Sequence, residues 1–245
     1  MRVRPILFLI LAAMVTACGS DATSGNGGNG SDGGGGSSGG GTGAGTGSYV
    51  GTTESGVATY YDATGAGNCS FDPSPGDLDV AAMDAPEYDN SNVCGECVAI
   101  TGPKGNVTVR IVDQCPECEV GHLDLSQSAF AKIADVSAGK VPISWNVVEC
   151  SVTGPISYHY KDGTSQYWTA IQARNTRLPI SSLEIQSGGT FTKVDRASYN
   201  YFVDTSGAGT GPVTVRLTAI DGQQVTDTLT PPASDVSIAG AAQFK

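Results

Sequence analysis

The sequence predicts an all-β protein in which two β-rich domains follow an export signal and a tether. Residues 107–112 form a short β-branched run, and helical periodicity is scarce along the chain. Val213, Val215 and Leu217 alternate with polar residues at the period of a half-buried strand. Asp221-Gly222 then supplies a hairpin turn. Many short strands separated by turn signals are typical of a β-sandwich.

Residues 1–17 have the pattern of a secretory signal peptide. A basic start, Met1–Arg4, precedes an apolar run, Pro5–Met14, that is too short to span a membrane. The small residues before Cys18 resemble a bacterial lipobox, which implies cleavage before Cys18 and attachment of lipid to its sulfur. An ordinary signal peptide with an incidental cysteine is the alternative. We expect an exported protein, at the cell surface or outer membrane or extracellular, that meets membrane only through a lipid anchor.

Composition divides the rest of the chain into a tether, residues 18–48, and two domains, 49–152 and 153–245. The tether is rich in Gly and Ser and has no large apolar residue to bury. Residues 50–153 carry 15 acidic and 4 basic residues, whereas residues 154–245 carry seven of each. The acidic first domain argues against nucleic acid or an anionic membrane surface as a partner, and leaves a neutral glycan open.

Two C-x-x-C pairs, at 94–97 and 115–118, have the spacing of a zinc ribbon. Export to an oxidising compartment argues against zinc. The domains also contain an even set of six cysteines, and zinc would leave Cys69 and Cys150 without partners. We therefore predict disulfides and no metal. Six cysteines allow fifteen connectivities, so spacing alone leaves the pairing open.

Two local patterns in the first domain predict particular elements. Ser126 can cap a helix that follows it, with Leu125 packing on Phe130 as a hydrophobic staple. Trp145 lies in a strand-like run, 141–148, and is expected in the core or at the domain interface.

Several motifs, taken in order, resemble one family. They are Gly56–Tyr61, Cys94–Cys97, Val112-Asp113, His122–Ser126, Thr164–Asn175 and Ser198–Val203. Together they resemble expansins, and those of the second half are similar to bacterial expansins. The resemblance implies a six-stranded double-psi β-barrel, like that of family 45 endoglucanases. An immunoglobulin-like β-sandwich, a family 63 carbohydrate-binding module, would follow it.

Similarity to plant expansins also implies a disulfide pattern. Cys69 would pair with Cys94, and Cys97 with Cys150. Cys115 and Cys118 would then close a small loop on the rim of a polysaccharide groove. Bacterial expansins often place an aromatic residue at the position of Cys115.

By the same resemblance Thr59, Asp113 and Asp124 line that groove, and Asp124 occupies the position of the general acid in family 45 glycosidases. A carboxyl in a groove can hydrogen-bond a glycosidic oxygen, and it can donate a proton if its pKa is raised. The alternative is that both aspartates only cap turns. His122, beside a turn, is interpreted as a simple polar contact.

Hydrolysis would need a second carboxylate. Expansins lack the catalytic base of the family 45 enzymes, but Asp62 resembles that position in register. Because residues 62–65 have strong turn composition, we interpret Asp62 as a surface turn residue and predict no catalytic residue.

Tyr167, Trp168 and Tyr199 are the expected glycan-stacking residues, with Lys161 at the surface near them. Neighbours on a regular strand point to opposite faces. Tyr167 and Trp168 can therefore share a face only where the backbone is irregular, and Ile171 would then point inward. The alternative is that these aromatics belong to the sandwich core.

The sequence thus predicts an expansin-like monomer without a cofactor. It would bind cellulose or a related β-glucan, with xyloglucan and peptidoglycan as other polymers to consider, and loosen polysaccharide networks without hydrolysis. One rival is a family 45-like endoglucanase with Asp124 as acid and Asp62 as base. A second is a lytic transglycosylase acting through Asp124, and a third is a carbohydrate-binding module whose first domain is only structural.

Overall fold

The computed structural model describes residues 51–245. The expected signal peptide, the tether and the lipidation site Cys18 lie outside the described residues. Residues 45–245 form one compact unit, which contains both β domains. Within the described part of the chain, no helix has both the length and the apolar character needed to cross a membrane.

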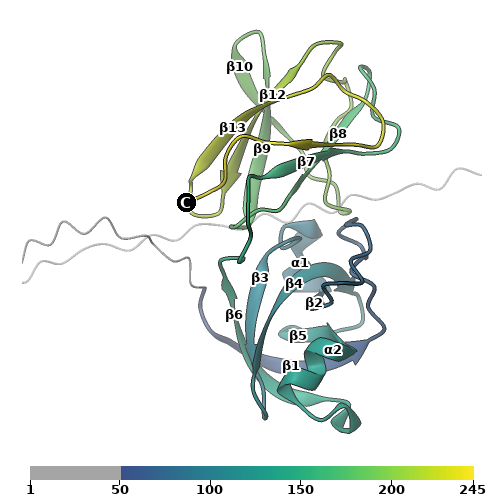
Figure 1. Cartoon of the computed structure of the whole chain (residues 1–245), viewed down its shortest axis with the longest axis vertical. Coiled ribbons are helices and arrows are strands. Elements are labelled where there is room, and N and C mark those ends of the chain that lie inside the picture. The colour runs from purple at the N-terminus through teal and green to yellow at the C-terminus, as the bar shows by residue number, and fades with distance from the viewer. Residues whose placement is uncertain (1–50) are drawn as a thin grey trace, which may run out of the picture. The chain divides into compact units, whose positions relative to one another are not determined.

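The first domain is a closed barrel of six strands in the order β1-β5-β2-β4-β3-β6, as Figure 1 shows. The strands are β1 (Glu54–Tyr61), β2 (Val80–Asp84), β3 (Cys97–Thr101), β4 (Asn106–Cys115), β5 (His122–Ser126) and β6 (Val141–Val148). The pairs β1–β5 and β2–β4 are parallel, and the other four are antiparallel. Two parallel pairs within an otherwise antiparallel six-stranded barrel confirm the double-psi prediction.

Short helices close the barrel. They are α1 (Ala85–Tyr88), α2 (Gln127–Ile133) and two 3₁₀ turns, η1 (Asp89–Ser91) and η2 (Val136–Ala138). The helix expected after Ser126 is present, because the Ser126 hydroxyl accepts the Ala129 N–H at 3.1 Å and caps α2. Phe130 of α2 is fully buried in the barrel core, and so is Trp145, at 5% exposed.

The second domain has two four-stranded sheets, β10-β9-β12-β13 and β11-β8-β7-β14, around its own core. Its strands are β7 (Ser157–Tyr160), β8 (Thr169–Arg174), β9 (Ile180–Ser187), β10 (Thr190–Val194), β11 (Phe202–Asp204), β12 (Val213–Ala219), β13 (Gln224–Leu229) and β14 (Val236–Ala239). In β12 the alternate residues from Val213 to Ala219 are buried, and the expected turn joins β12 to β13. The sandwich prediction is confirmed.

Three disulfides join the cysteines that the zinc alternative would have used. The bonds are Cys69–Cys94, Cys97–Cys150 and Cys115–Cys118, which is the pairing that the resemblance implies. Among the described residues, no group of three or more His, Cys, Asp or Glu side chains could hold a metal ion.

One buried carboxyl makes fold stability depend on pH. Glu96 is 6% exposed, and burial raises its pKa to about 8, helped by Glu87 and opposed by Arg196. Since this folded-state pKa lies above the ordinary value of 4.5, the folded protein binds the extra proton, and stability falls as pH rises through this range.

We predict that Glu96→Gln flattens the loss of unfolding free energy between about pH 4.5 and pH 8. The variant should match the wild type near pH 4.5 and exceed it at pH 8. Urea unfolding at several pH values measures this, with the exposed Glu119→Gln as the matched control. An unchanged pH slope in Glu96→Gln would show that Glu96 is not protonated in the folded protein.

Candidate functional site

Strand pairing aligns the expected acidic residues in one row across the barrel. Thr59 of β1 pairs with Asp124 of β5, and Asp124 pairs with Ala82 of β2. Ala82 in turn pairs with Asp113 of β4. Directly paired residues place their side chains on the same face of a sheet. We call Thr59, Asp124, Ala82 and Asp113 the acidic row.

A bulge in β4 brings Asp113 into this row. The β2–β4 register shifts between Ala81 and Ala82, so that Ala81 pairs with Ile111 and Ala82 with Asp113. Ile111 is in the barrel core, and without the extra residue, Val112, strict alternation would turn Asp113 inward. Bulges are a common way of re-aiming a side chain.

The row lies on the outer face of the barrel. The residues flanking it along the strands point inward: Ala58, Ala81, Leu123, Leu125 and Ile111 are all fully buried in the core. One strand, β2, separates the two aspartates, so their Cα atoms lie roughly 10 Å apart. Asp113 and Asp124 therefore face the same side without touching each other.

Asp124 is held by a short chain of hydrogen bonds. The Thr59 hydroxyl donates to Asp124 Oδ1 at 2.5 Å, and His122 Nε2 lies 2.9 Å from the same hydroxyl. Because the hydroxyl proton goes to Asp124, the Nε2–H of His122 is the donor to Thr59. His122 therefore makes the polar contact expected of it. Burial lowers the pKa of His122, with Lys140 acting in the same direction.

Burial raises the pKa of Asp124, whereas the Thr59 hydrogen bond and His122 lower it. Asp113 is fixed differently, since its Oδ1 accepts the backbone N–H groups of Asn68 at 2.7 Å and Gln114 at 2.9 Å. Gly67 is required beside it, because a Cβ there would lie 2.4 Å from Asp113 Cγ. The two carboxyls thus differ: Asp124 is poised to share a proton, and Asp113 is anchored as an acceptor.

Tyr61 is a residue of this surface that the sequence reasoning did not single out. Its hydroxyl is buried without a hydrogen-bond partner, and its pKa is raised first by burial and then by Asp113 and Asp124. Tyr61 packs on Ala82 and the Cys115–Cys118 disulfide. The alternation of β1 could have indicated it, because Tyr61 is two residues beyond Thr59 and shares its face.

Asp62, the candidate base, is exposed and follows the end of β1. It lies three residues beyond Thr59, roughly 10 Å along the chain. No hydrogen bond or ion pair of the Asp62 side chain occurs in the described part of the protein. The structure therefore gives Asp62 no partner that would orient it toward Asp124.

The expected aromatic residues lie in turns rather than on strands. Tyr167 is 75% exposed at the tip of a tight turn closed by the Ser165–Trp168 bridge. This is the irregular backbone that a shared face for Tyr167 and half-buried Trp168 requires, and Ile171 points into the core as expected. An exposed Tyr167 excludes the core alternative for that residue.

Tyr199 lies in a turn just before β11. Lys161, half-buried rather than fully exposed, places its Nζ 6.0 Å from the Tyr199 ring centre and 5.9 Å from that of Tyr201. Because Thr169 pairs with Asp204, Trp168 and Tyr199 extend the β8–β11 pair at opposite ends. Three to six residues of strand separate them, or roughly 10–20 Å. We call Tyr167, Trp168, Tyr199 and Lys161 the aromatic platform.

Two cavities lie where the barrel meets the sandwich. One has a volume of about 550 Å³ and includes Phe71, Arg110 and Arg174, and the other, of about 330 Å³, includes Glu96 and Ile220. Neither is lined by the acidic row or by the aromatic platform, so these two groups of residues belong to other parts of the surface.

Comparison with known proteins agrees with this architecture. A family model described as lytic transglycolase matches residues 80–145, which lie within the barrel. Expansin-YoaJ of Bacillus subtilis is 38% identical over 182 residues, which cover 71% of this chain and 77% of that protein. Expansin-like protein 2 of Dictyostelium discoideum is 36% identical over 202 residues, covering 78% of this chain but 50% of that protein.

Two solved structures are similar over both domains. The apo expansin of Clavibacter michiganensis superposes with a TM-score of 0.73 at 36% identity, covering 79% of this chain and 98% of the other. A variant of that expansin, crystallised in complex with cellohexaose, gives a TM-score of 0.74 at 35% identity and the same coverage.

A double-psi barrel with carboxyls on its outer face, followed by a β-sandwich with exposed aromatics, defines a class of two-domain carbohydrate-binding proteins. Within that class the identities and the coverage place this chain plainly: it belongs to the expansin family.

We predict that Thr59→Val raises the pKa of Asp124 further, because the substitution removes a hydrogen bond to the ionised carboxyl. A ¹³C NMR titration of the aspartate carboxyl groups measures the shift, with Thr108→Val on the same barrel as control. A lower or unchanged Asp124 pKa would contradict this account of the Thr59 contact.

Proposed function

We propose that this protein binds cellulose or a related β-glucan and loosens the contacts between glucan chains without hydrolysing them. The aromatic platform would hold one chain by stacking on the apolar faces of its sugar rings. The acidic row would bind and strain a neighbouring chain through hydrogen bonds from its hydroxyl groups. The one observation that carries this proposal is that Asp124 and Asp113 share an open face of the barrel while Tyr167 stands exposed on the sandwich.

The chemistry of the acidic row favours binding over cutting. Asp124, with its raised pKa, can donate a hydrogen bond or a proton. Inverting hydrolysis needs a second carboxylate roughly 6.5–9.5 Å from the acid, with water between them. Asp113 is engaged by two backbone N–H groups, and Asp62 is solvated without a partner. Exchange of hydrogen bonds between chains therefore suits this surface better than hydrolysis through Asp62.

A second candidate function rests on the match of the barrel to the lytic transglycolase model. In that function Asp124 would act alone as acid and base on peptidoglycan. Release of soluble fragments from purified peptidoglycan, lost in Asp124→Asn, would favour it. We further propose that export and a lipid anchor at Cys18 display the monomeric protein at the cell surface, where such polymers occur.

Asp124→Asn should abolish loosening, because the amide can no longer share a proton or match the charge of the carboxylate. Creep of cellulose filter paper and the release of reducing ends are followed together for the wild type and the variant. Creep without new reducing ends, lost in the variant, is the expected result. New reducing ends that vanish with both Asp124→Asn and Asp62→Asn would instead identify a glycosidase.

Tyr167→Ala should weaken binding to cellulose by about fivefold, since one face of a buried ring contributes on the order of 1 kcal/mol. Depletion isotherms on microcrystalline cellulose measure the change. Ile220→Ala, at another exposed apolar residue of the sandwich, serves as control. Equal affinity of Tyr167→Ala and the wild type would remove Tyr167 from the platform.

A further inference from the structure

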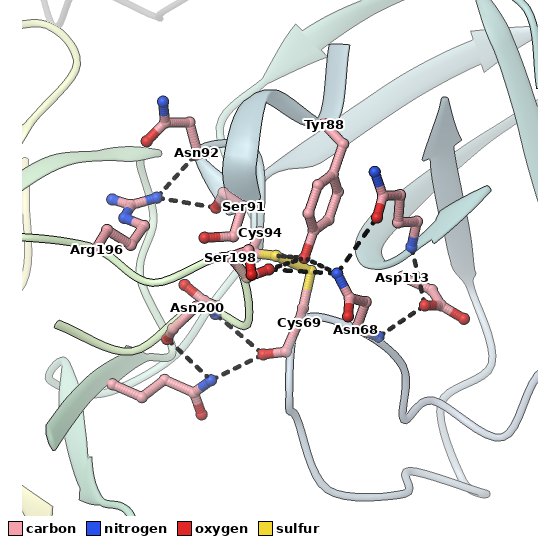
Figure 2. Close-up of a disulfide and its surroundings, with 12 residues drawn as sticks. Asn68, Cys69, Tyr88, Ser91, Asn92, Cys94, Asp113, Arg196, Ser198 and Asn200 are labelled. Carbon is pink, nitrogen blue, oxygen red and sulfur yellow. Dashed lines mark hydrogen bonds between the residues drawn. A yellow bond between two sulfur atoms is a disulfide. The ribbon is translucent and has the colours of Figure 1, made fainter. Parts of the chain in front are cut away.

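The dipeptide Asn68–Cys69 contacts both parts of the proposed glucan-binding surface. The backbone N–H of Asn68 donates to Asp113 Oδ1 at 2.7 Å. Its side-chain amide donates to the Tyr88 hydroxyl at 3.0 Å and to the Ser198 carbonyl at 3.2 Å. Ser198 directly precedes Tyr199, so one residue links a carboxyl of the acidic row to the loop of the aromatic platform (Figure 2).

The neighbouring residue holds the other side of the same loop. The Cys69 carbonyl accepts hydrogen bonds from Gln172 Nε2 at 2.8 Å and from Asn200 Nδ2 at 3.2 Å. Asn200 is 5% exposed and adopts the left-handed conformation, with φ at 62°, which asparagine tolerates better than most residues. The turn from residue 197 to residue 200 is therefore fixed immediately before and immediately after Tyr199.

The dipeptide is itself firmly anchored to the barrel. Cys69 is fully buried, is bonded to Cys94, and donates its N–H to the Val112 carbonyl at 3.1 Å. Val112 is the extra residue of the bulge that directs Asp113 outward. Tyr88, which receives the Asn68 amide, donates its own hydroxyl to the Ser198 carbonyl at 3.1 Å. A displacement of the Tyr199 loop would thus have to break contacts that start from the acidic row.

Unlike Cys69, Asn68 is an exposed residue. Its side chain fills no part of the core, and an exposed hydrogen-bonding residue contributes little to overall stability. This separates its effect on geometry from any effect on folding. A side chain with this much hydrogen bonding and this little burial is suited to setting the register of two surfaces.

We propose that Asn68 is a positioning residue that holds the acidic row and the Tyr199 loop in one fixed register. Both parts of the surface can then engage the same glucan assembly at once. This inference rests on the proposed function, because register affects loosening only if both parts bind glucan. Loosening needs simultaneous engagement, whereas simple adhesion through Tyr167 and Trp168 does not, so Asn68 should affect the first far more than the second.

Asn68→Ala tests this proposal, because it keeps the backbone N–H to Asp113 and removes the side-chain amide. Asn68→Asp replaces the donors with acceptors facing the Ser198 carbonyl, and Asn68→Gln restores an amide. The matched control is Asn92→Ala, since Asn92 is an exposed asparagine near the same interface whose side chain bonds only Asp89 within the barrel. Creep, cellulose affinity, thermal unfolding and hydrogen exchange of residues 197–201 are measured for each variant.

We expect Asn68→Ala and Asn68→Asp to lose creep several-fold and to exchange amide hydrogens of residues 197–201 several-fold faster. Affinity and melting temperature should stay near those of the wild type, and Asn68→Gln should recover part of the creep. Wild-type creep in Asn68→Ala would overturn the proposal. A joint fall of creep, affinity and melting temperature would also overturn it, by showing a merely structural role.

The exchange measurement separates this inference from the proposed function. If the wild type does not loosen cellulose at all, the proposed function fails and exchange alone decides the role of Asn68. Faster exchange at residues 197–201 in Asn68→Ala but not in Asn92→Ala would then support the positioning role. Unchanged exchange would refute it.

Discussion

The site depends above all on the position of β2 between β4 and β5. A parallel pairing on one side and an antiparallel pairing on the other bring Asp113 and Asp124 to the same level on either side of Ala82. The small side chain of Ala82 leaves the space between the two carboxyls open. This arrangement needs the bulge at Val112, because strand periodicity would otherwise turn Asp113 into the core. The acidic row is thus a product of strand register.

Burial and hydrogen bonding then give the two carboxyls different properties. Partial burial of Asp124 favours its protonated form, while Thr59 and His122 favour the ionised form and moderate the shift. Asp113 instead accepts two backbone N–H groups. A surface with one adjustable carboxyl and one fixed acceptor can exchange hydrogen bonds with sugar hydroxyls in both directions. The apolar neighbours of the row, Tyr61 and the Cys115–Cys118 disulfide, reduce competition from water.

The barrel and the sandwich are joined by polar contacts that converge on main-chain carbonyls. Arg196 donates to the carbonyls of Ser91 and Asn92 at 3.0 Å each, and Arg174 pairs with Asp72 at 2.7 Å. Most of the partners are main-chain atoms next to the Cys69–Cys94 disulfide, as Figure 2 shows. Directional bonds to rigid backbone fix orientation more closely than apolar packing does, which is what a binding surface built from two domains requires.

The sequence by itself determined the elements whose signals are local. Ser126 as a helix cap, the alternation of β12 and the 221–222 turn depend on nearest neighbours along the chain, and they could be predicted. The family motifs extended this to the barrel, the sandwich and the disulfide pairing. Only the tertiary structure decided which residues meet across strands, because register depends on non-local pairing. Hence the partner of Thr59, the place of Tyr61 beside the acids and the link from Asn68 to the Tyr199 loop could not be predicted.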